Sequence, residues 1–106
     1  MSELRPRAQR FAMQTPLRYR EVGVETWLDG RLENISRSGV FFRTDSALGL
    51  KTSVQMSFSL PVSITGDDPG EVYCWGSVVR TVPARDGKLS GIAVAMRSYR
   101  LVRRHH

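Results

Sequence analysis

The segment Val54-Gln55-Met56-Ser57-Phe58-Ser59-Leu60 alternates apolar and polar side chains along its whole length. Successive side chains of a β-strand point to opposite faces of a sheet, so the apolar residues share one face and the polar residues share the other. Such an alternation is typical of a strand with one face in a core and one in water. The segment therefore predicts a half-buried β-strand.

Segments of similar character continue in both directions from this strand. Asp29-Gly30 and Asp86-Gly87 are hairpin signals, because Asp and Gly tolerate the positive φ that a tight two-residue turn requires. A polar loop rich in proline and glycine follows Leu60 and ends at Gly70. The predicted strands are 22–28, 31–35, 40–43, 54–60, 72–82 and 89–96, and an extended segment at 11–19 precedes them.

Six or seven short strands joined by tight turns, with no helix between them, predict an all-β fold. The expected architecture is a small antiparallel β-barrel, because closing the sheet hides its edges and buries one face of every strand. We expect residues 1–14 to form a flexible basic arm and residues 15–96 to form the barrel. Residues 97–106 are expected to be a basic tail or a short helix, with Leu101 packed inward in the helical case.

Length and composition narrow the class of protein. A chain of 106 residues with 41% hydrophobic content suits one small globular domain with a single core. No apolar run approaches the ~20 residues that span a bilayer, and the N-terminus lacks the apolar region of a secretory signal. The single cysteine, Cys74, permits neither an internal disulfide nor a cysteine-based zinc site. We therefore expect a cytoplasmic protein without a membrane span.

Positive charge is concentrated at the two ends of the chain. The formal net charge is +6, and residues 1–20 carry five arginines against one acid. Residues 97–106 carry four more arginines and no acid. Arginine outnumbers lysine 14 to 2, a bias that suits planar, bidentate recognition of phosphate or guanine, although GC-rich codon usage would produce it too. The distribution indicates an anionic partner that meets the basic ends.

Catalytic residues are scarce, so we expect a protein that is not an enzyme. The two histidines, His105 and His106, are adjacent at the C-terminus and resemble the remnant of a purification tag. No interior imidazole is present to activate a nucleophile. Asp67-Asp68 lies in the proline- and glycine-rich loop, and two adjacent carboxylates alone do not make a metal site. Neither a cofactor nor a metal is expected.

The segment Asn34-Ile35-Ser36-Arg37-Ser38-Gly39 is the strongest candidate for a binding site. Side chains two residues apart in a strand point the same way, so the Asn34 amide and the Ser36 hydroxyl can converge on one ligand edge. Gly39 tolerates positive φ and carries no side chain where backbone and ligand would collide. An ordinary polar turn would show a similar pattern. The arginines upstream, Arg5, Arg7 and Arg10, favour the binding interpretation.

These residues closely resemble the signature of the PilZ domain family. The resemblance runs from Arg10-Phe11 through Thr15-Pro16-Leu17-Arg18-Tyr19 and the Asn34–Gly39 turn to the Gly91-Ile92-Ala93-Val94 segment, which is nearly the whole chain. The resemblance implies an antiparallel barrel that binds the bacterial second messenger cyclic di-GMP. The family's two motifs are RxxxR near the N-terminus and (D/N)xSxxG at a strand start. The implied ligand-binding residues are Arg5, Arg7, Arg10, Asn34, Ser36 and Gly39.

The second motif matches at every fixed position, whereas the first does not. If Arg10 is the second arginine of RxxxR, the first falls on Pro6, which has no guanidinium group. Arg5 and Arg7 flank Pro6, so either of them is expected to take over the missing role. Some family members with broken motifs do not bind the nucleotide and act through protein partners instead, and this departure keeps that alternative open.

Three functions follow from these features. The first is a cyclic di-GMP receptor that couples the level of the second messenger to a downstream protein partner through rearrangement of the arm. The second is an adaptor that binds a protein partner without nucleotide. The third is a small basic barrel that binds nucleic acid, for which the near-neutral middle of the chain is unfavourable. The aromatic residues that could stack on bases are expected instead to pack within the sheet: Trp27, Phe41, Phe42, Tyr73 and Trp75.

Overall fold

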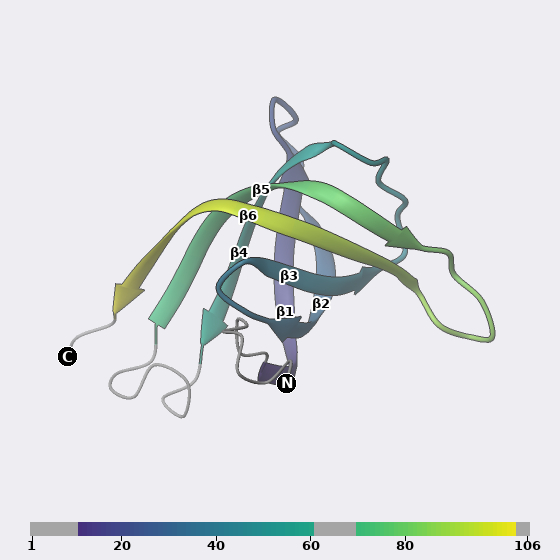
Figure 1. The fold of residues 1–106 in the computed structure, drawn as a ribbon, viewed down its shortest axis with the longest axis horizontal. Helices are drawn as coiled ribbons and strands as arrows, with labels where there is room; N and C mark the ends of the chain where they lie inside the picture. Colours follow the sequence, from purple (N-terminus) through teal and green to yellow (C-terminus); the bar gives the residue numbers. More distant parts are fainter. Residues whose placement is uncertain (1–10, 61–69, 104–106) are drawn as a thin grey trace, which may run out of the picture.

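The computed structural model describes residues 11–60 and 70–103, which form a closed barrel of antiparallel strands (Figure 1). The all-β barrel predicted from the sequence is confirmed, with six strands. The strands are β1 (Phe11–Glu21), β2 (Leu28–Ile35), β3 (Gly39–Thr44), β4 (Ser53–Leu60), β5 (Gly70–Val82) and β6 (Ser90–Arg103).

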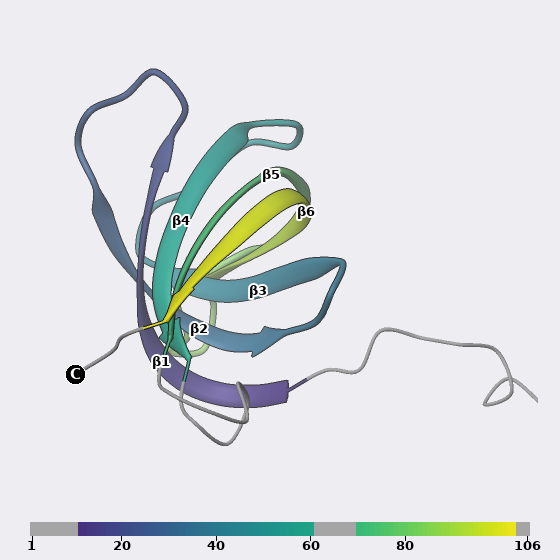
Figure 2. The same ribbon diagram turned by 90° about the vertical axis from the view of Figure 1, so that its left-hand side faces the viewer.

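The strand order β1-β2-β3-β6-β5-β4 divides the barrel into two meanders. Within each meander, β1-β2-β3 or β4-β5-β6, every strand pairs with its neighbour in the sequence. Two seams join the meanders: β1 pairs with β4, and β3 pairs with β6. The two views in Figures 1 and 2 show the strands curving around a common interior.

The core is made by every second residue of the strands, as the alternation in β4 predicts. Val54, Met56 and Phe58 are buried, while the polar residues between them are partly exposed on the outer face. Burying one large apolar side chain completely contributes about 1.5–3 kcal/mol to folding. The other core residues are Leu48, in the connection between β3 and β4, and the strand residues Leu17, Tyr19, Leu32, Ile35, Val40, Phe42, Val72, Cys74, Val78, Ile92 and Val94.

A buried polar contact ties the first strand to the third. The Tyr19 hydroxyl lies 2.7 Å from Thr44 Oγ1, and Thr44 Oγ1 donates in turn to the Asp29 carbonyl at 3.3 Å. The Tyr19 and Phe42 rings pack with their centroids 4.9 Å apart. Because buried hydroxyls must be hydrogen-bonded to avoid a desolvation penalty, this network specifies how β1, β2 and β3 meet inside the barrel.

The structure corrects the predicted hairpin at Asp29-Gly30. Both residues lie within β2, where they pair with Arg18 and Leu17 of β1, and residues 22–27 connect the strands instead of forming one. Gly30 is explained by close approach of the next strand. A Cβ atom at this position would lie 2.9 Å from the Arg43 carbonyl oxygen and 3.1 Å from the Phe42 ring. Glycine is therefore needed at position 30 because β3 packs closely against it, and not because the chain turns there.

The second predicted hairpin is confirmed. Asp86 and Gly87 take positive φ angles of 53° and 76°, as a two-residue type I′ turn requires. The flanking residues exchange both backbone hydrogen bonds, from Arg85 N to the Lys88 oxygen at 3.2 Å and from Lys88 N to the Arg85 oxygen at 2.9 Å. This turn sets the register between β5 and β6.

The described part of the C-terminal tail is a strand, so the short helix offered as an alternative there is wrong. β6 continues to Arg103 because β5 extends far enough to pair with it, from Gly70 opposite Arg103 to Trp75 opposite Ser98. Leu101, expected to pack inward from a helix, packs against the core from strand β6. β1 begins at Phe11, so described barrel residues extend beyond the expected range of 15–96 at both ends. No helix long and apolar enough to cross a membrane occurs in the described residues.

Cys74 provides a test of the core. It is fully buried, and desolvation by its apolar surroundings raises the pKa of its thiol to about 12. The reactive thiolate is therefore almost absent from the native protein at pH 8.5, whereas an unfolded cysteine is about half ionised there. We expect iodoacetamide to label the native chain at least roughly 100-fold more slowly than the chain in guanidinium chloride.

A Ser53→Cys variant is the matched control, because Ser53 is an exposed residue of the neighbouring strand β4. Mass spectrometry should show one thiol of this variant reacting at once and the second only after denaturation. Rapid double labelling of the folded variant would contradict the buried position of Cys74.

Candidate ligand-binding site

A β-bulge in β2 determines which way the predicted site residues face. Leu32 pairs with Phe42 and Asn34 pairs with Phe41, so Glu33 is an extra residue between two consecutive pairs. Leu32 and Ile35 are buried, and Glu33 and Asn34 both lie on the partly exposed side between them. Ser36 follows Ile35 and is also partly exposed. The structure therefore brings Asn34 and Ser36 onto one outer face, as their spacing predicts.

The turn between β2 and β3 holds the Ser36 hydroxyl in place. The Ser36 backbone N–H donates to the Gly39 carbonyl at 2.9 Å and closes the hairpin. The Ser36 Oγ accepts a hydrogen bond from the Ser38 N–H at 3.3 Å and lies 3.3 Å from the Ser38 Oγ. Arg37, between the two serines, is exposed. The turn thus presents two hydroxyls and one guanidinium group at the outer end of the hairpin.

Gly39 is required by the neighbouring strand. A Cβ atom at Gly39 would lie 2.8 Å from the Val94 carbonyl oxygen of β6. At the same place the Met96 N–H donates to the Ser38 carbonyl at 2.9 Å, so β6 and the turn are in direct contact. The tolerance of Gly39 for positive φ is not used, because only Gly23 and Gly87 have positive φ among the described glycines. Whether Gly39 also makes room for a ligand stays a prediction.

The three predicted arginines, Arg5, Arg7 and Arg10, lie outside the described residues. The structure does show where the chain that follows them enters the barrel. Phe11 pairs with Ile35 and Ala12 pairs with Asn34, so β1 begins beside the second motif. The first motif therefore leads into β1 at the place where β1 pairs with the second motif in β2, although the two motifs are more than twenty residues apart in sequence.

A family model described as the PilZ domain matches residues 4–105, which is essentially the whole chain. The chain belongs to the PilZ domain family. This is a family of cyclic di-GMP receptor domains and not a family of enzymes. A search among curated proteins found no match.

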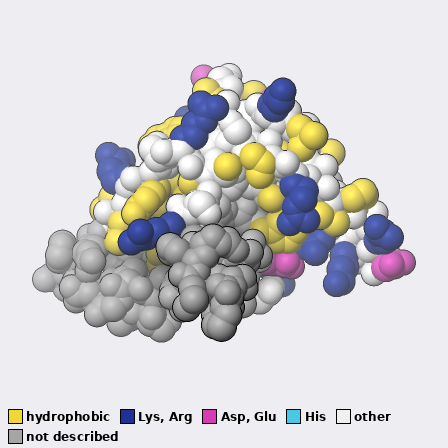
Figure 3. Space-filling model, in the orientation of Figure 1, with side chains coloured by type: hydrophobic (Ala, Val, Ile, Leu, Met, Phe, Trp, Pro, Cys, Tyr) yellow, Lys and Arg dark blue, Asp and Glu magenta, His cyan; other side chains and the backbone are white. Residues whose placement is uncertain are grey.

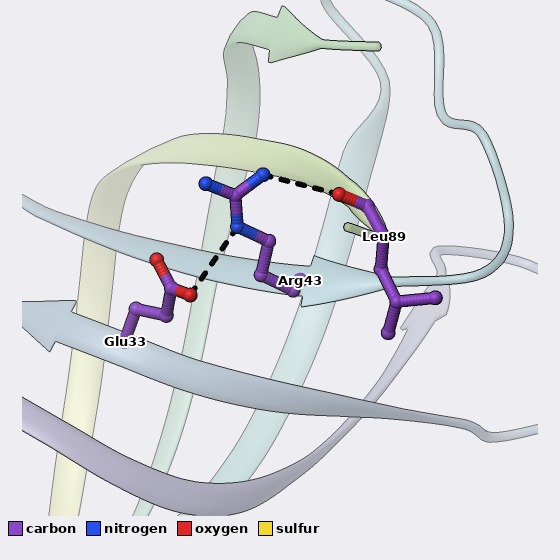
Figure 4. A network of polar contacts seen from close by, with 3 residues as sticks. All are labelled: Glu33, Arg43 and Leu89. Carbon is purple, nitrogen blue, oxygen red and sulfur yellow. Dashed lines mark hydrogen bonds and ion pairs between the residues drawn. The ribbon is translucent and has the colours of Figure 1, made fainter. Parts of the chain in front are cut away.

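This PilZ domain also carries outward-facing residues that the sequence did not single out as part of the site. Arg43 on β3 bonds Glu33 Oε2 through Nε at 3.3 Å and the Leu89 carbonyl through Nη1 at 3.1 Å (Figure 4). The Arg43 and Arg80 guanidinium carbons lie 5.2 and 5.8 Å from the centroid of the Phe41 ring. Since these contacts depend on the register between strands, no local pattern in the sequence would have revealed them.

Arg37, Arg43 and Arg80 lie near the predicted site residues, and the described part of the chain contains no metal-binding cluster. Figure 3 shows lysine and arginine side chains spread among hydrophobic ones over the visible face of the barrel. In residues 11–60 and 70–103, no group of three histidine, cysteine or carboxylate side chains is placed to bind a metal ion. The site therefore offers hydrogen bonds, guanidinium groups and aromatic surface, which are the groups that recognise a nucleotide.

The contact at Gly39 gives a test of the turn. In Gly39→Ala, the added methyl group must push β3 away from the Val94 carbonyl of β6, because backbone cannot yield like a flexible side chain. We expect the free energy of unfolding in urea to fall by about 1–3 kcal/mol.

Gly49→Ala is the matched control. Gly49 has no positive φ, and its new Cβ would meet only Thr52 Oγ1, at an ordinary 3.7 Å. The free energy of unfolding of this variant should stay within about 0.5 kcal/mol of the native value. Equal stability of the two variants would mean that the turn accommodates a side chain at position 39.

Proposed function

We propose that this PilZ domain is a cytoplasmic cyclic di-GMP receptor, in which Arg10 with Arg5 or Arg7 binds the nucleotide against Asn34 and Ser36. The main support is that Asn34 and Ser36 both face outward beside the start of β1. The chain also matches the family over residues 4–105. Rearrangement of the basic arm on binding would transmit the signal to a downstream protein partner.

The chemistry of cyclic di-GMP suits these residues. The nucleotide has two phosphates and two guanines, and each guanine presents the O6 and N7 acceptors that an arginine fork binds. The Asn34 amide and the Ser36 hydroxyl add donors and acceptors at the base edge. A bidentate arginine–guanine contact supplies about 1–3 kcal/mol of discrimination. Micromolar affinity corresponds to about −8 kcal/mol, so two or three such contacts with added stacking account for it after the cost of ordering the arm.

The second candidate function is an adaptor that binds a protein partner without nucleotide. One observation favours it: Pro6 occupies the place of the first arginine in the family's RxxxR motif. Calorimetric titration with cyclic di-GMP distinguishes the two functions, because the adaptor would release no heat of binding at any ligand concentration.

We expect Arg10→Ala to weaken cyclic di-GMP binding by about 10- to 100-fold, because it removes a charge-assisted fork. Asn34→Ala and Ser36→Ala should each weaken binding less, since neutral hydrogen bonds contribute about half as much. Titration calorimetry gives the dissociation constants, and thermal melts check that each variant is folded.

Arg85→Ala is the control for loss of one positive charge. Arg85 is exposed at the Asp86-Gly87 hairpin, whereas Asn34 and Ser36 lie by the β2–β3 turn. Its affinity should match that of the native protein. A folded Arg10→Ala variant with native affinity would show that Arg10 does not bind the ligand, and a larger loss in Ser36→Ala would reverse the proposed order.

Restoring the family motif gives an independent test. A Pro6→Arg variant places a guanidinium group at the family's first arginine position and should bind cyclic di-GMP at least as tightly as the native chain. Single Arg5→Ala and Arg7→Ala changes should be unequal, because an extended backbone directs neighbouring side chains to different sides. A folded Pro6→Arg variant that shows no binding at millimolar ligand would eliminate the receptor function and leave the adaptor.

A further inference from the structure

One row of residues crosses four strands on the outer face of the barrel. Asn34 of β2 pairs with Phe41 of β3, Phe41 with Ala93 of β6, and Ala93 with Arg80 of β5. Residues directly opposite each other in antiparallel strands point to the same face. With strands about 4.8 Å apart, Arg80 lies about 14 Å from Asn34 across three strand spacings. The row therefore connects the family's second motif with an arginine from the other meander.

The Phe41 ring is fixed on the surface by the strand beneath it. A Cβ atom at Gly91 of β6 would lie 2.5 Å from Phe41 Cζ, so the ring lies over the space that Gly91 leaves open. The same atom would lie 3.2 Å from the Val82 Cβ of β5. The aromatic ring thus reaches across β6 toward β5 and offers a rigid surface on which guanidinium groups can stack.

The two arginines at this ring differ in what else they contact. Arg43 donates from Nε to the Glu33 carboxylate and from Nη1 to the Leu89 carbonyl, and the carboxylate balances its charge (Figure 4). Arg80 is exposed, and no hydrogen bond or ion pair to the described residues holds it. A bulge between Val78 and Arg80 in β5 brings Arg80 opposite Ala93 on the outer face. Arg80 is thus oriented by the ring while its charge and its hydrogen-bond donors remain available.

We propose that Arg80, stacked on Phe41, is a further nucleotide-binding residue that reads the O6/N7 edge of one guanine of cyclic di-GMP. This inference rests on the proposed function and deepens it. A nucleotide held at Asn34 and Ser36 by one guanine presents its second guanine along the row toward Arg80. Ala93, the only residue between Phe41 and Arg80 in the row, is too short to obstruct it. The planar fork of arginine matches the two acceptors of guanine, and stacking on the ring reduces the entropy lost on binding.

The test combines a protein variant with a ligand variant. Cyclic di-GMP built from 7-deazaguanine lacks the N7 acceptors but keeps both phosphates and both O6 atoms. Dissociation constants are measured by calorimetry for the native chain and for Arg80→Ala with each ligand. We expect Arg80→Ala to weaken binding of cyclic di-GMP by roughly tenfold. The loss on changing to the deaza ligand should be several-fold smaller in Arg80→Ala than in the native chain, because one guanine contact is already missing.

Arg100→Ala is the matched control. The Arg100 guanidinium carbon lies 5.7 Å from the centroid of the Tyr73 ring, so the variant also removes one exposed, ring-stacked arginine. Arg100 is opposite Tyr73, outside the row that contains Asn34. Native affinity is expected for this variant. Arg80→Lys, which keeps the charge but loses the fork, should bind more weakly than the native chain.

Each outcome decides the inference. Native affinity in folded Arg80→Ala would overturn it and leave the receptor function intact. If Arg80→Ala lost the same affinity for both ligands, Arg80 would not bind the O6/N7 edge of guanine, since a phosphate contact does not depend on N7. An equal loss of affinity in Arg100→Ala would show that any exposed arginine contributes through its charge, and it would overturn a specific role for Arg80. Absence of cyclic di-GMP binding by the native chain would overturn both the receptor function and this inference.

Discussion

Closure of the sheet between β1 and β4 is the constraint on which the rest of the barrel depends. Leu17 pairs with Phe58 and Tyr19 pairs with Met56, and all four side chains point into the core. Once the first and fourth strands are hydrogen-bonded, every strand has two neighbours and one face of each is removed from water. An open sheet of the same six strands would expose one apolar face and two edges.

Closure also divides the residues into those that make the core and those that are available for function. Because side chains alternate along a strand, each core residue leaves its neighbours on the outer face. The bulges at Glu33 and between Val78 and Arg80 add outer positions without displacing core residues. In β2 the extra residue is Glu33, whose carboxylate orients Arg43. The outer surface is therefore shaped by local irregularities in an otherwise regular ladder.

Features that depend on residues adjacent in the sequence could be predicted from it. Features that depend on contacts between strands distant in the sequence could not. The alternation in β4, the outward placement of Asn34 and Ser36, and the Asp86-Gly87 turn are local, and the structure confirms them. Asp29-Gly30 has the composition of a tight turn, but position 30 needs a glycine because β3 packs too closely for a side chain. Residues 98–103 form a strand instead of a helix because β5 is long enough to pair with them. The stacking of Arg80 on Phe41 depends on a register across three strands, which alternation alone does not specify.

The division into two meanders has a consequence for the speed of folding and unfolding. Each meander is built from hairpins between consecutive strands, and isolated hairpins form within about 1–10 μs. The seams β1–β4 and β3–β6 join segments distant in the chain, so their formation carries the larger loop-closure entropy and is expected to be slow. Asn34 belongs to one meander and Arg80 to the other. A molecule that spans them would hold the β3–β6 seam shut and lengthen the lifetime of the native barrel, while the rate at which the hairpins form would stay the same.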